Sequence, residues 1–218
     1  KHRTARMAIE TASYAMEIQG GNGYVSDFVT HRLYRDAQVL PIWEGTSNIL
    51  SLDLLRALET EDAHEVLVPL ISEYLDAAEH PSLEGIASTV RSHFETLQEA
   101  LLTLATEDDE YAQHEAKELA DVLFDVGTGA ILLAKAQERL DADGDGREAV
   151  VARLFVEDTL VDRDGRGILD GETLPIEHFD AVVRYAALEP DRLSGWAVGD
   201  APEGQAEPHK PDTDTGGR

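Results

Sequence analysis

The clearest helix signal in the sequence is "LPIWEGTSNILSLDLLRALE", positions 40–59, where a polar turn separates an apolar run from a leucine-rich segment. Thr46, Ser47 or Asn48 can serve as the N-cap of a helix, because each side chain can accept a hydrogen bond from a first-turn N–H. The apolar residues that follow recur at the spacing of one helix face. They are Ile49, Leu50, Leu52, Leu54, Leu55 and Leu58. The stretch therefore predicts a helix over residues 45–59.

The chain on both sides of this stretch also predicts helices. Residues 1–19 carry an Ala-rich apolar stripe at helical spacing, and the glycines of residues 20–27 predict a loop after it. Further helices are expected at residues 28–40, 61–80, 84–106, about 108–140, 147–160 and 176–188. The sequence has no strand-rich region, so the predicted fold class is all-α.

Composition divides the chain into three predicted parts. Residues 1–60 form the first helical domain, and residues 61–195 form an extension of acidic amphipathic helices. Residues 196–218 are rich in Gly, Pro and Asp, and we expect them to be disordered. Within the extension, "GTGA" (127–130) is a patch of small residues that would let another helix approach closely.

The chain is strongly acidic, with 44 Asp and Glu against 18 Lys and Arg and a net charge of −26. The acid is spread along the sequence, as in proteins that work in concentrated salt. We interpret it as adaptation to high salt in a cytoplasmic protein, and an ordinary acidic protein is the alternative. The charge disfavours binding to nucleic acid. No apolar run approaches the length of a membrane span.

Glu44 has two interpretations from the residues around it. Beside the apolar ring of Trp43, a carboxylate would lose hydration, which would raise its pKa and let it act as a base. Alternatively, Glu44 only favours the positive end of the helix that follows. Two further segments, "EIQGGNGY" (17–24) and "GTSNI" (45–49), offer backbone N–H groups that suit a phosphate, although a tight turn and plain N-capping explain each alone.

The ordered set "EIQGGNGY" (17–24), "RLYRDA" (32–37) and "LPIWEGTSNIL" (40–50) resembles the C-terminal helical domain of the acyl-CoA dehydrogenase family of flavoproteins. The resemblance implies FAD as cofactor, an acyl-CoA thioester as substrate, and α,β-dehydrogenation as the reaction. It also implies a homo-oligomer, usually a tetramer, and electron-transfer flavoprotein as the electron acceptor. The long extension and Trp43 resemble the branch related to the DNA-alkylation-response flavoproteins, but the acidic charge argues against carrying over a DNA role.

The resemblance also assigns roles to residues. Glu44 would be the catalytic base, which removes the α-proton while the β-hydrogen leaves as hydride to the flavin. Trp43 and Gly45 would contact the substrate. Part of the cofactor contacts would reach the FAD of a neighbouring subunit. The cofactor-binding residues would be Glu17, Ile18, Gln19, Gly20, Gly21, Thr46, Ser47 and Asn48.

Some features depart from the family or stay open. Relatives commonly have Gln where Glu17 stands and Tyr where Trp43 stands. The chain starts in a helical pattern, so we expect it to be a C-terminal fragment that is inactive alone. The alternative functions are a stress-response flavoprotein without dehydrogenase turnover and a helical oligomerisation module. We assign no metal site, because "DADGDG" (141–146) lacks the last EF-hand ligand and reads as solvated acidic turns.

Overall fold

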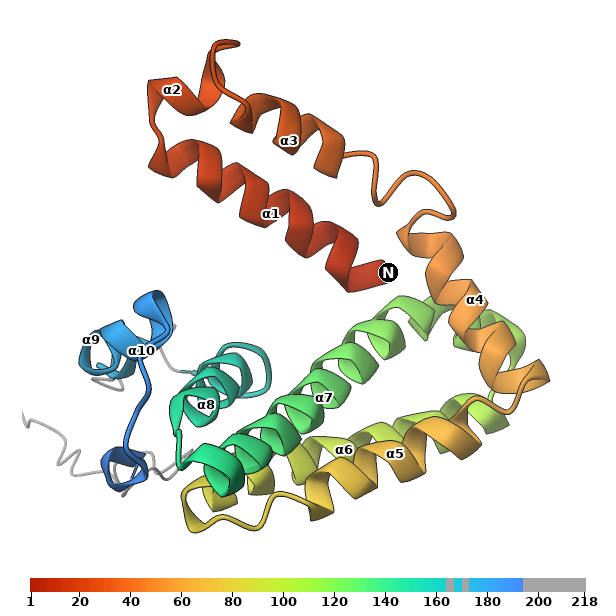
Figure 1. The fold of residues 1–218 in the computed structure, drawn as a ribbon. Helices are drawn as coiled ribbons and strands as arrows, with labels where there is room; N and C mark the ends of the chain where they lie inside the picture. Colours follow the sequence, from red (N-terminus) through yellow and green to blue (C-terminus); the bar gives the residue numbers. More distant parts are fainter. Residues whose placement is uncertain (164–166, 170–172, 194–218) are drawn as a thin grey trace, which may run out of the picture.

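The computed structural model describes residues 1–163, 167–169 and 173–193, and the described residues contain helices and no strand (Figure 1). The all-α prediction is confirmed. The predicted disorder of residues 196–218 concerns residues outside those described. The elements are α1 (His2–Ile18), α2 (Gly21–Tyr24), α3 (Thr30–Ala37), α4 (Ser47–Thr60), α5 (His64–Asp76), η1 (Pro81–Leu83), α6 (Glu84–Thr106), α7 (Asp109–Asp143), α8 (Arg147–Thr159), α9 (Leu174–Glu177), α10 (Phe179–Arg184) and η3 (Pro190–Leu193).

Helix α7 is the axis of the extension. Its 35 residues make it about 52 Å long at 1.5 Å per residue. Asp108 caps its start by accepting a hydrogen bond from the Tyr111 N–H at 2.9 Å. Gly144 ends it in a left-handed conformation, φ 64°, which a glycine adopts without strain. Helices α4, α5, α6 and α8 all pack against α7, so it carries most of the core (Figure 1).

The core lies where α7 meets its neighbours. Val126 and Leu133 of α7, Val90 of α6 and Val156 of α8 are fully buried. The same core cluster includes Leu55 of α4. Helix α4 therefore belongs to the predicted first domain by sequence, yet packs as part of the extension. The domain boundary at residue 60 stays a prediction, and the packing crosses it.

The small-residue patch at 127–130 is used inside the chain. A Cβ on Gly129 would lie 3.2 Å from Val90 Cγ2 and 3.7 Å from Val156 Cγ2. Gly129 and Ala130 are buried against α6 and α8. The close approach of helices is thus confirmed, and its partners are the chain's own helices. Gly129 and Ala130 are therefore not available to a second chain, whereas Ile131, directly after the patch, is 49% exposed.

Helices α1 and α3 form a hairpin that stands apart from the extension (Figure 1). The predicted loop at 20–27 holds a short helical turn, α2. Gly20 enters that turn at φ 59° and ψ −139°, a conformation that only glycine adopts readily. Gly23 packs on the α1 backbone, because a Cβ there would lie 2.3 Å from the Met16 carbonyl oxygen.

The end of the chain is more broken than the sequence indicates. In place of one helix at 176–188, two short helices, α9 and α10, meet at His178. Helix α10 stops at Arg184 because Tyr185 takes a left-handed conformation, φ 58°. The apolar spacing of residues 176–188 carried no signal for this stop.

Candidate functional site

Glu44 lies in the turn between α3 and α4, in a left-handed backbone conformation that L-residues other than Asn and Asp rarely adopt. Its φ is 53°, and Gly45 after it has φ 107°. The Lys1 ammonium, at the start of α1, donates hydrogen bonds to the carbonyl oxygens of Trp43 and Gly45. The distance to the Gly45 oxygen is 2.8 Å. A left-handed Glu costs about 1–2 kcal/mol, so the surrounding contacts must hold the turn in this form.

The side chains of this turn face solvent. Glu44 is exposed, and Trp43 is 55% exposed. Pro41 is buried and anchors the start of the turn. The described residues of this chain therefore do not surround the carboxylate with apolar groups. A low-polarity pocket for Glu44 stays a prediction, and its walls would have to come from elsewhere.

The start of α4 presents hydrogen-bond donors that no capping side chain occupies. Thr46 stands at the N-cap position with an extended backbone, yet within the described chain its side chain accepts no hydrogen bond from the helix. Ser51 is buried and donates to the Ser47 carbonyl at 2.9 Å. Thr46 and Asn48 are exposed. The first-turn N–H groups are thus free to bind an anion, which a helix N-terminus favours.

The glycine loop at the other end of the hairpin is also open. Glu17, Ile18, Gly20 and Gly21 are exposed, and Ile18 is 86% exposed. Nothing lies within 4 Å of the position where a Cβ would stand on Gly20 or Gly21. This space would let another molecule approach the backbone closely.

The Gln19 side chain connects this loop to another helix. Its Oε1 accepts a hydrogen bond from the Thr30 hydroxyl at 2.8 Å, and Thr30 is buried at the start of α3. The bond joins the end of α1 to the start of α3. It therefore fixes the loop relative to the hairpin.

The two predicted segments lie at opposite ends of α1. Lys1, at its start, contacts the Glu44 turn, and the loop of residues 17–21 follows its end. With 17 residues, α1 spans about 25 Å. The chain therefore brings Trp43, Gly45 and Ser47 together around Glu44, but it keeps residues 17–21 away from them.

An ion cluster that sequence reasoning missed joins α1 to α7. The His2 ring lies 3.0 Å from the Asp121 carboxylate, and the Arg3 guanidinium lies 3.5 Å from Asp121 and 3.2 Å from Asp125. The Arg3 guanidinium also lies 5.5 Å from the centre of the Phe124 ring. Burial raises the pKa of Asp125 above its usual value, and the charge of Arg3 opposes this shift. The run Lys1–His2–Arg3, three basic residues in an acidic chain, was the available signal.

The described residues contain no group of three His, Asp or Glu side chains that could hold a metal ion. Asp145 differs from the predicted solvated turn. Its carboxylate accepts hydrogen bonds from the Arg147 N–H at 3.0 Å and the Leu188 N–H at 2.9 Å. Asp145 therefore joins the first N–H of α8 to the chain at residue 188. Across the described helices, none is long and apolar enough to cross a membrane.

The left-handed Glu44 before α4 and the glycine turn after α1 both lie in the part of the chain that matches a known family. Residues 1–59 match the family model "Acyl-CoA dehydrogenase, C-terminal domain". This part of the chain therefore belongs to the acyl-CoA dehydrogenase family, as the sequence resemblance predicted.

Particular relatives extend the comparison. The chain is 31% identical over 163 residues to "Acyl-CoA dehydrogenase family member 11" of Caenorhabditis elegans, which is 72% of this chain and 26% of that protein. It is 49% identical over 47 residues to "Putative acyl-CoA dehydrogenase AidB" of Escherichia coli, which is 22% of this chain and 9% of that protein. The crystal structure of C. elegans ACDH-11 in complex with C11-CoA matches with a TM-score of 0.66 and 26% identity. That match covers 84% of this chain and 31% of the other.

The matches differ in how much of the chain they cover. The chain spans about a quarter of the length of the worm relative. Because 163 matched residues exceed the 59 of the family domain, the worm protein shares much of the extension as well. The similarity to the worm protein thus continues beyond the family domain into the extension.

Proposed function

We propose that the chain is the C-terminal part of an FAD-dependent acyl-CoA dehydrogenase, with Glu44 as the base. In the reaction, the Glu44 carboxylate takes the α-proton of the acyl thioester, and a double bond forms between the α and β carbons. Bound FAD would supply the acceptor for the β-hydrogen, which leaves with its electron pair. An electron-transfer flavoprotein would then reoxidise the cofactor. Acyl-CoA as ligand class is supported by the C11-CoA complex of the worm structure.

The observation that carries the proposal is the strained turn at Glu44. Backbone strain in a non-glycine residue persists only where other contacts maintain it, and it concentrates at functional sites. Here Lys1 binds the carbonyl oxygens on both sides of Glu44. The side chain itself is exposed to whatever binds against the turn. The Glu44 backbone is constrained and its carboxylate is exposed. This arrangement suits a base that acts on a substrate bound against the turn.

The residues present also fit part of FAD. The uncapped first turn of α4, at Thr46, Ser47 and Asn48, offers N–H donors suited to an anionic group of the cofactor. The open backbone at Gly20 and Gly21 offers a second place where a bulky group could come close. These two surfaces would bind and orient the cofactor, and they leave the proton transfer to Glu44.

The distance between these surfaces supports a homo-oligomer. Since α1 keeps residues 17–21 about 25 Å from the Glu44 turn, one chain does not direct both at the same place. We assign Glu17, Ile18, Gln19, Gly20 and Gly21 to the cofactor site of a neighbouring copy. A tetramer, the usual assembly of the family, would let every copy both give and receive this loop.

Anaerobic titration of the full-length protein that contains this chain tests the function. Acyl-CoAs of increasing chain length are added in buffer with molar salt while the flavin absorption is recorded. Bleaching by a subset of them is the expected result. A bound flavin that no acyl-CoA bleaches would contradict the dehydrogenase and support the stress-response alternative.

The variant Glu44→Gln tests the base. It keeps the size of the side chain and removes the proton acceptor, so we expect at least a 100-fold loss of kcat with FAD still bound. Glu95→Gln, an exposed glutamate on α6, is the matched control and should keep full turnover. Turnover by Glu44→Gln at the rate of the control would remove Glu44 from the mechanism.

A further inference from the structure

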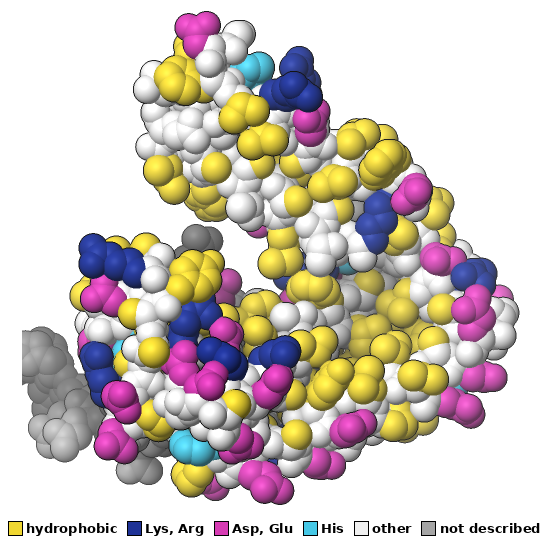
Figure 2. Space-filling model, in the orientation of Figure 1, with side chains coloured by type: hydrophobic (Ala, Val, Ile, Leu, Met, Phe, Trp, Pro, Cys, Tyr) yellow, Lys and Arg dark blue, Asp and Glu magenta, His cyan; other side chains and the backbone are white. Residues whose placement is uncertain are grey.

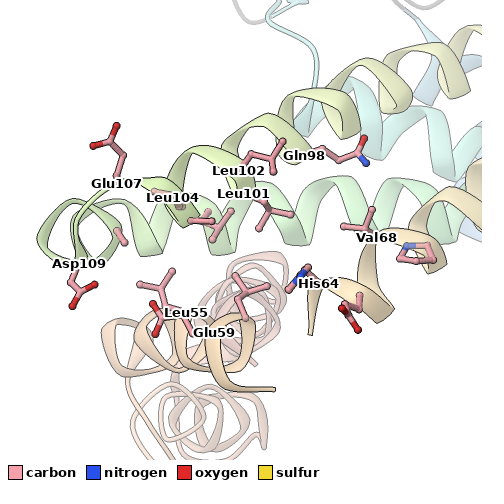
Figure 3. Close-up of a pocket in the computed structure, with 16 residues that line it drawn as sticks. Leu55, Glu59, His64, Val68, Gln98, Leu101, Leu102, Leu104, Glu107 and Asp109 are labelled. Carbon is pink, nitrogen blue, oxygen red and sulfur yellow. The ribbon is translucent and has the colours of Figure 1, made fainter. Parts of the chain in front are cut away.

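A second candidate site lies away from Glu44, in the extension. A cavity of about 630 Å³ opens between α4, α5, α6 and α7, at the end of the bundle where α4 leads into α5 and α6 leads into α7 (Figure 3). This volume is in the range of small-molecule binding sites. Figure 2 shows apolar side chains gathered in the hollow between α4, α5 and α7. Neither the family domain alone nor the extension alone forms this cavity, because α4 supplies one wall and α5 to α7 supply the others.

Most side chains that line the cavity are aliphatic, and its polar lining residues are His64, Gln98 and four carboxylates. Leu101 and Leu104 of α6 extend toward Leu55 of α4, and Val68 of α5 lines the cavity further along, near His64 (Figure 3). Among the described residues that line it, none is Phe, Tyr or Trp, and none carries a hydroxyl group. A ligand with polar groups along its length would find few hydrogen-bond partners here, and burying those groups would be unfavourable. A flexible hydrocarbon chain has no such groups and matches these walls.

Burial is graded from the floor to the mouth. Leu119 and Ala112 of α7 form the floor and are 4% and 6% exposed, and Leu55 is 9% exposed. At the mouth, Leu102 of α6 is 70% exposed. An apolar side chain left so open beside a cavity would lose water contact when a ligand enters. The gradient suits a chain that inserts with its end toward α7 and leaves its head group at the mouth.

The charges around the cavity select the head group. Four carboxylates line it, those of Glu59, Glu65, Glu107 and Asp109. Within the part of the chain that the structure describes, no Lys or Arg is among the lining residues. Glu107 and Asp109 stand at the connection from α6 to α7, with the Glu107 carboxylate directed outward (Figure 3). Such a rim attracts a cation and repels a phosphate.

We propose that this cavity binds a single aliphatic chain with a positively charged head group, the chemistry of an alkylammonium ion. The hydrocarbon fills the leucine-lined interior, and the head group lies among the carboxylates of the rim. The same rim excludes the phosphates of coenzyme A, so the site is distinct from the one proposed at Glu44. The proposal requires neither flavin nor Glu44, so it can fail or hold independently of the dehydrogenase function.

Calorimetric titration of the full-length protein that contains this chain with octyl-, decyl- and dodecyltrimethylammonium, each below its micelle concentration, tests the interior. We expect one saturable site whose affinity rises about fourfold per added methylene, equivalent to about 0.8 kcal/mol. Absence of a saturable site, or an affinity independent of chain length, would overturn the proposal. Binding of a basic amphipathic peptide in place of the alkylammonium ions would overturn it in favour of a docked partner helix.

A blocking variant locates the site. Ala105 is exposed on α6 and lines the cavity, so Ala105→Trp would fill the opening without disturbing the core. Thr103 is exposed in the same turn of α6 and does not line the cavity, so Thr103→Trp is the matched control. We expect Ala105→Trp to weaken dodecyltrimethylammonium binding at least tenfold and Thr103→Trp to leave it unchanged. Equal affinities of the two variants would place the binding elsewhere.

Head-group selectivity is tested with dodecyl sulfate and with charge variants. At low salt, dodecyltrimethylammonium should bind at least tenfold more tightly than dodecyl sulfate, and the preference should shrink in 1 M NaCl, where the screening length is about 3 Å. The preference for dodecyltrimethylammonium over dodecyl sulfate should also fall in the triple variant Glu59→Gln, Glu65→Gln and Glu107→Gln. The control combines Glu73→Gln, Glu95→Gln and Glu118→Gln, which lie outside the cavity and change the net charge equally. Equal loss of selectivity in both triple variants would assign the effect to net charge and overturn the role of the rim.

Discussion

Arg3 and Asp125 lie 3.2 Å apart, nitrogen to oxygen, across the junction between α1 and α7. The pair joins the hairpin, which carries the motifs at residues 17–24 and 32–37, to the axis of the extension. Burial raises the pKa of Asp125, and Arg3 lowers it, so the ion pair only partly offsets the loss of hydration. Burying the Asp125 charge at this junction therefore costs free energy that the ion pair with Arg3 does not fully recover.

The first prediction concerns the pH dependence of this junction. Because the pKa of Asp125 is higher in the folded than in the unfolded chain, the folded state binds more protons between the two values, and stability from this group falls as pH rises. Asp125→Asn cannot titrate. The difference in free energy of unfolding, variant minus wild type, should therefore become more positive as pH rises from the ordinary aspartate pKa of 3.8 through the raised pKa of the folded state.

Urea unfolding at several pH values measures this difference. Asp76→Asn, at an exposed aspartate of α5, is the control for the loss of one negative charge. A difference for Asp125→Asn that stays flat with pH, or falls, would contradict the shift of the Asp125 pKa.

Two glycines in one helix give the second prediction. Nothing lies within 4 Å of the position that a Cβ on Gly127 would take, so Gly127→Ala should stabilise the chain by up to about 1 kcal/mol through helix propensity. A Cβ on Gly129 would lie 3.2 Å from the fully buried Val90 side chain. Gly129→Ala should therefore destabilise the chain by about 1 kcal/mol net, even though alanine has the higher helix propensity. Thermal unfolding of both variants checks the signs. A stabilising Gly129→Ala would mean that α6 yields to the added methyl group.

The third prediction concerns strain at Glu44. Glu44→Gly should stabilise the chain by about 1 kcal/mol, because glycine adopts φ 53° without the penalty of a Cβ. Glu44→Ala removes the same carboxylate but keeps the Cβ, so it should give no such gain. Denaturant unfolding of the two variants separates the backbone from the charge. Equal stabilities would show that the turn relaxes in solution.

The fourth prediction follows from the net charge of −26. Repulsion among the carboxylates opposes the folded state, and salt screens it. The melting temperature should therefore rise by roughly 4–8 °C between 0.1 and 1 M NaCl, equivalent to about 2 kcal/mol. Sucrose at matched osmolality is the control for effects other than screening. A melting temperature unaffected by NaCl would argue against adaptation to high salt.

Features set by near neighbours in sequence were predictable. Helix α4 follows the apolar spacing that the sequence displays, although Thr46 makes no capping hydrogen bond. Helix α7 ends at left-handed Gly144, inside the "DADGDG" segment that was expected to end it. The family motifs likewise sit in contiguous segments. This is why the helices and the family character of residues 1–59 could be recognised from the sequence alone.

Features set by distant partners were not predictable. The contact from His2 to Asp121 spans 119 positions, and the one from Arg3 to Asp125 spans 122. The left-handed backbone of Glu44 has no signal either, since such a φ is expected of Gly or Asn. The cavity arises from how α4, α5, α6 and α7 diverge, a property of the assembled bundle.

The hairpin of α1 to α3 has a consequence for how the chain opens. Ala5, Gly23, Thr30 and Ala37 are its buried residues, and its contacts with the rest lie at the start of α1 (Figure 1). Amide protons of this segment should exchange with solvent long before those of α7, because the hairpin can detach without opening the bundle. The chain thus holds two units of unequal lifetime. The glycine loop at residues 17–21 lies on the shorter-lived unit, whereas Glu44 lies between that unit and α4.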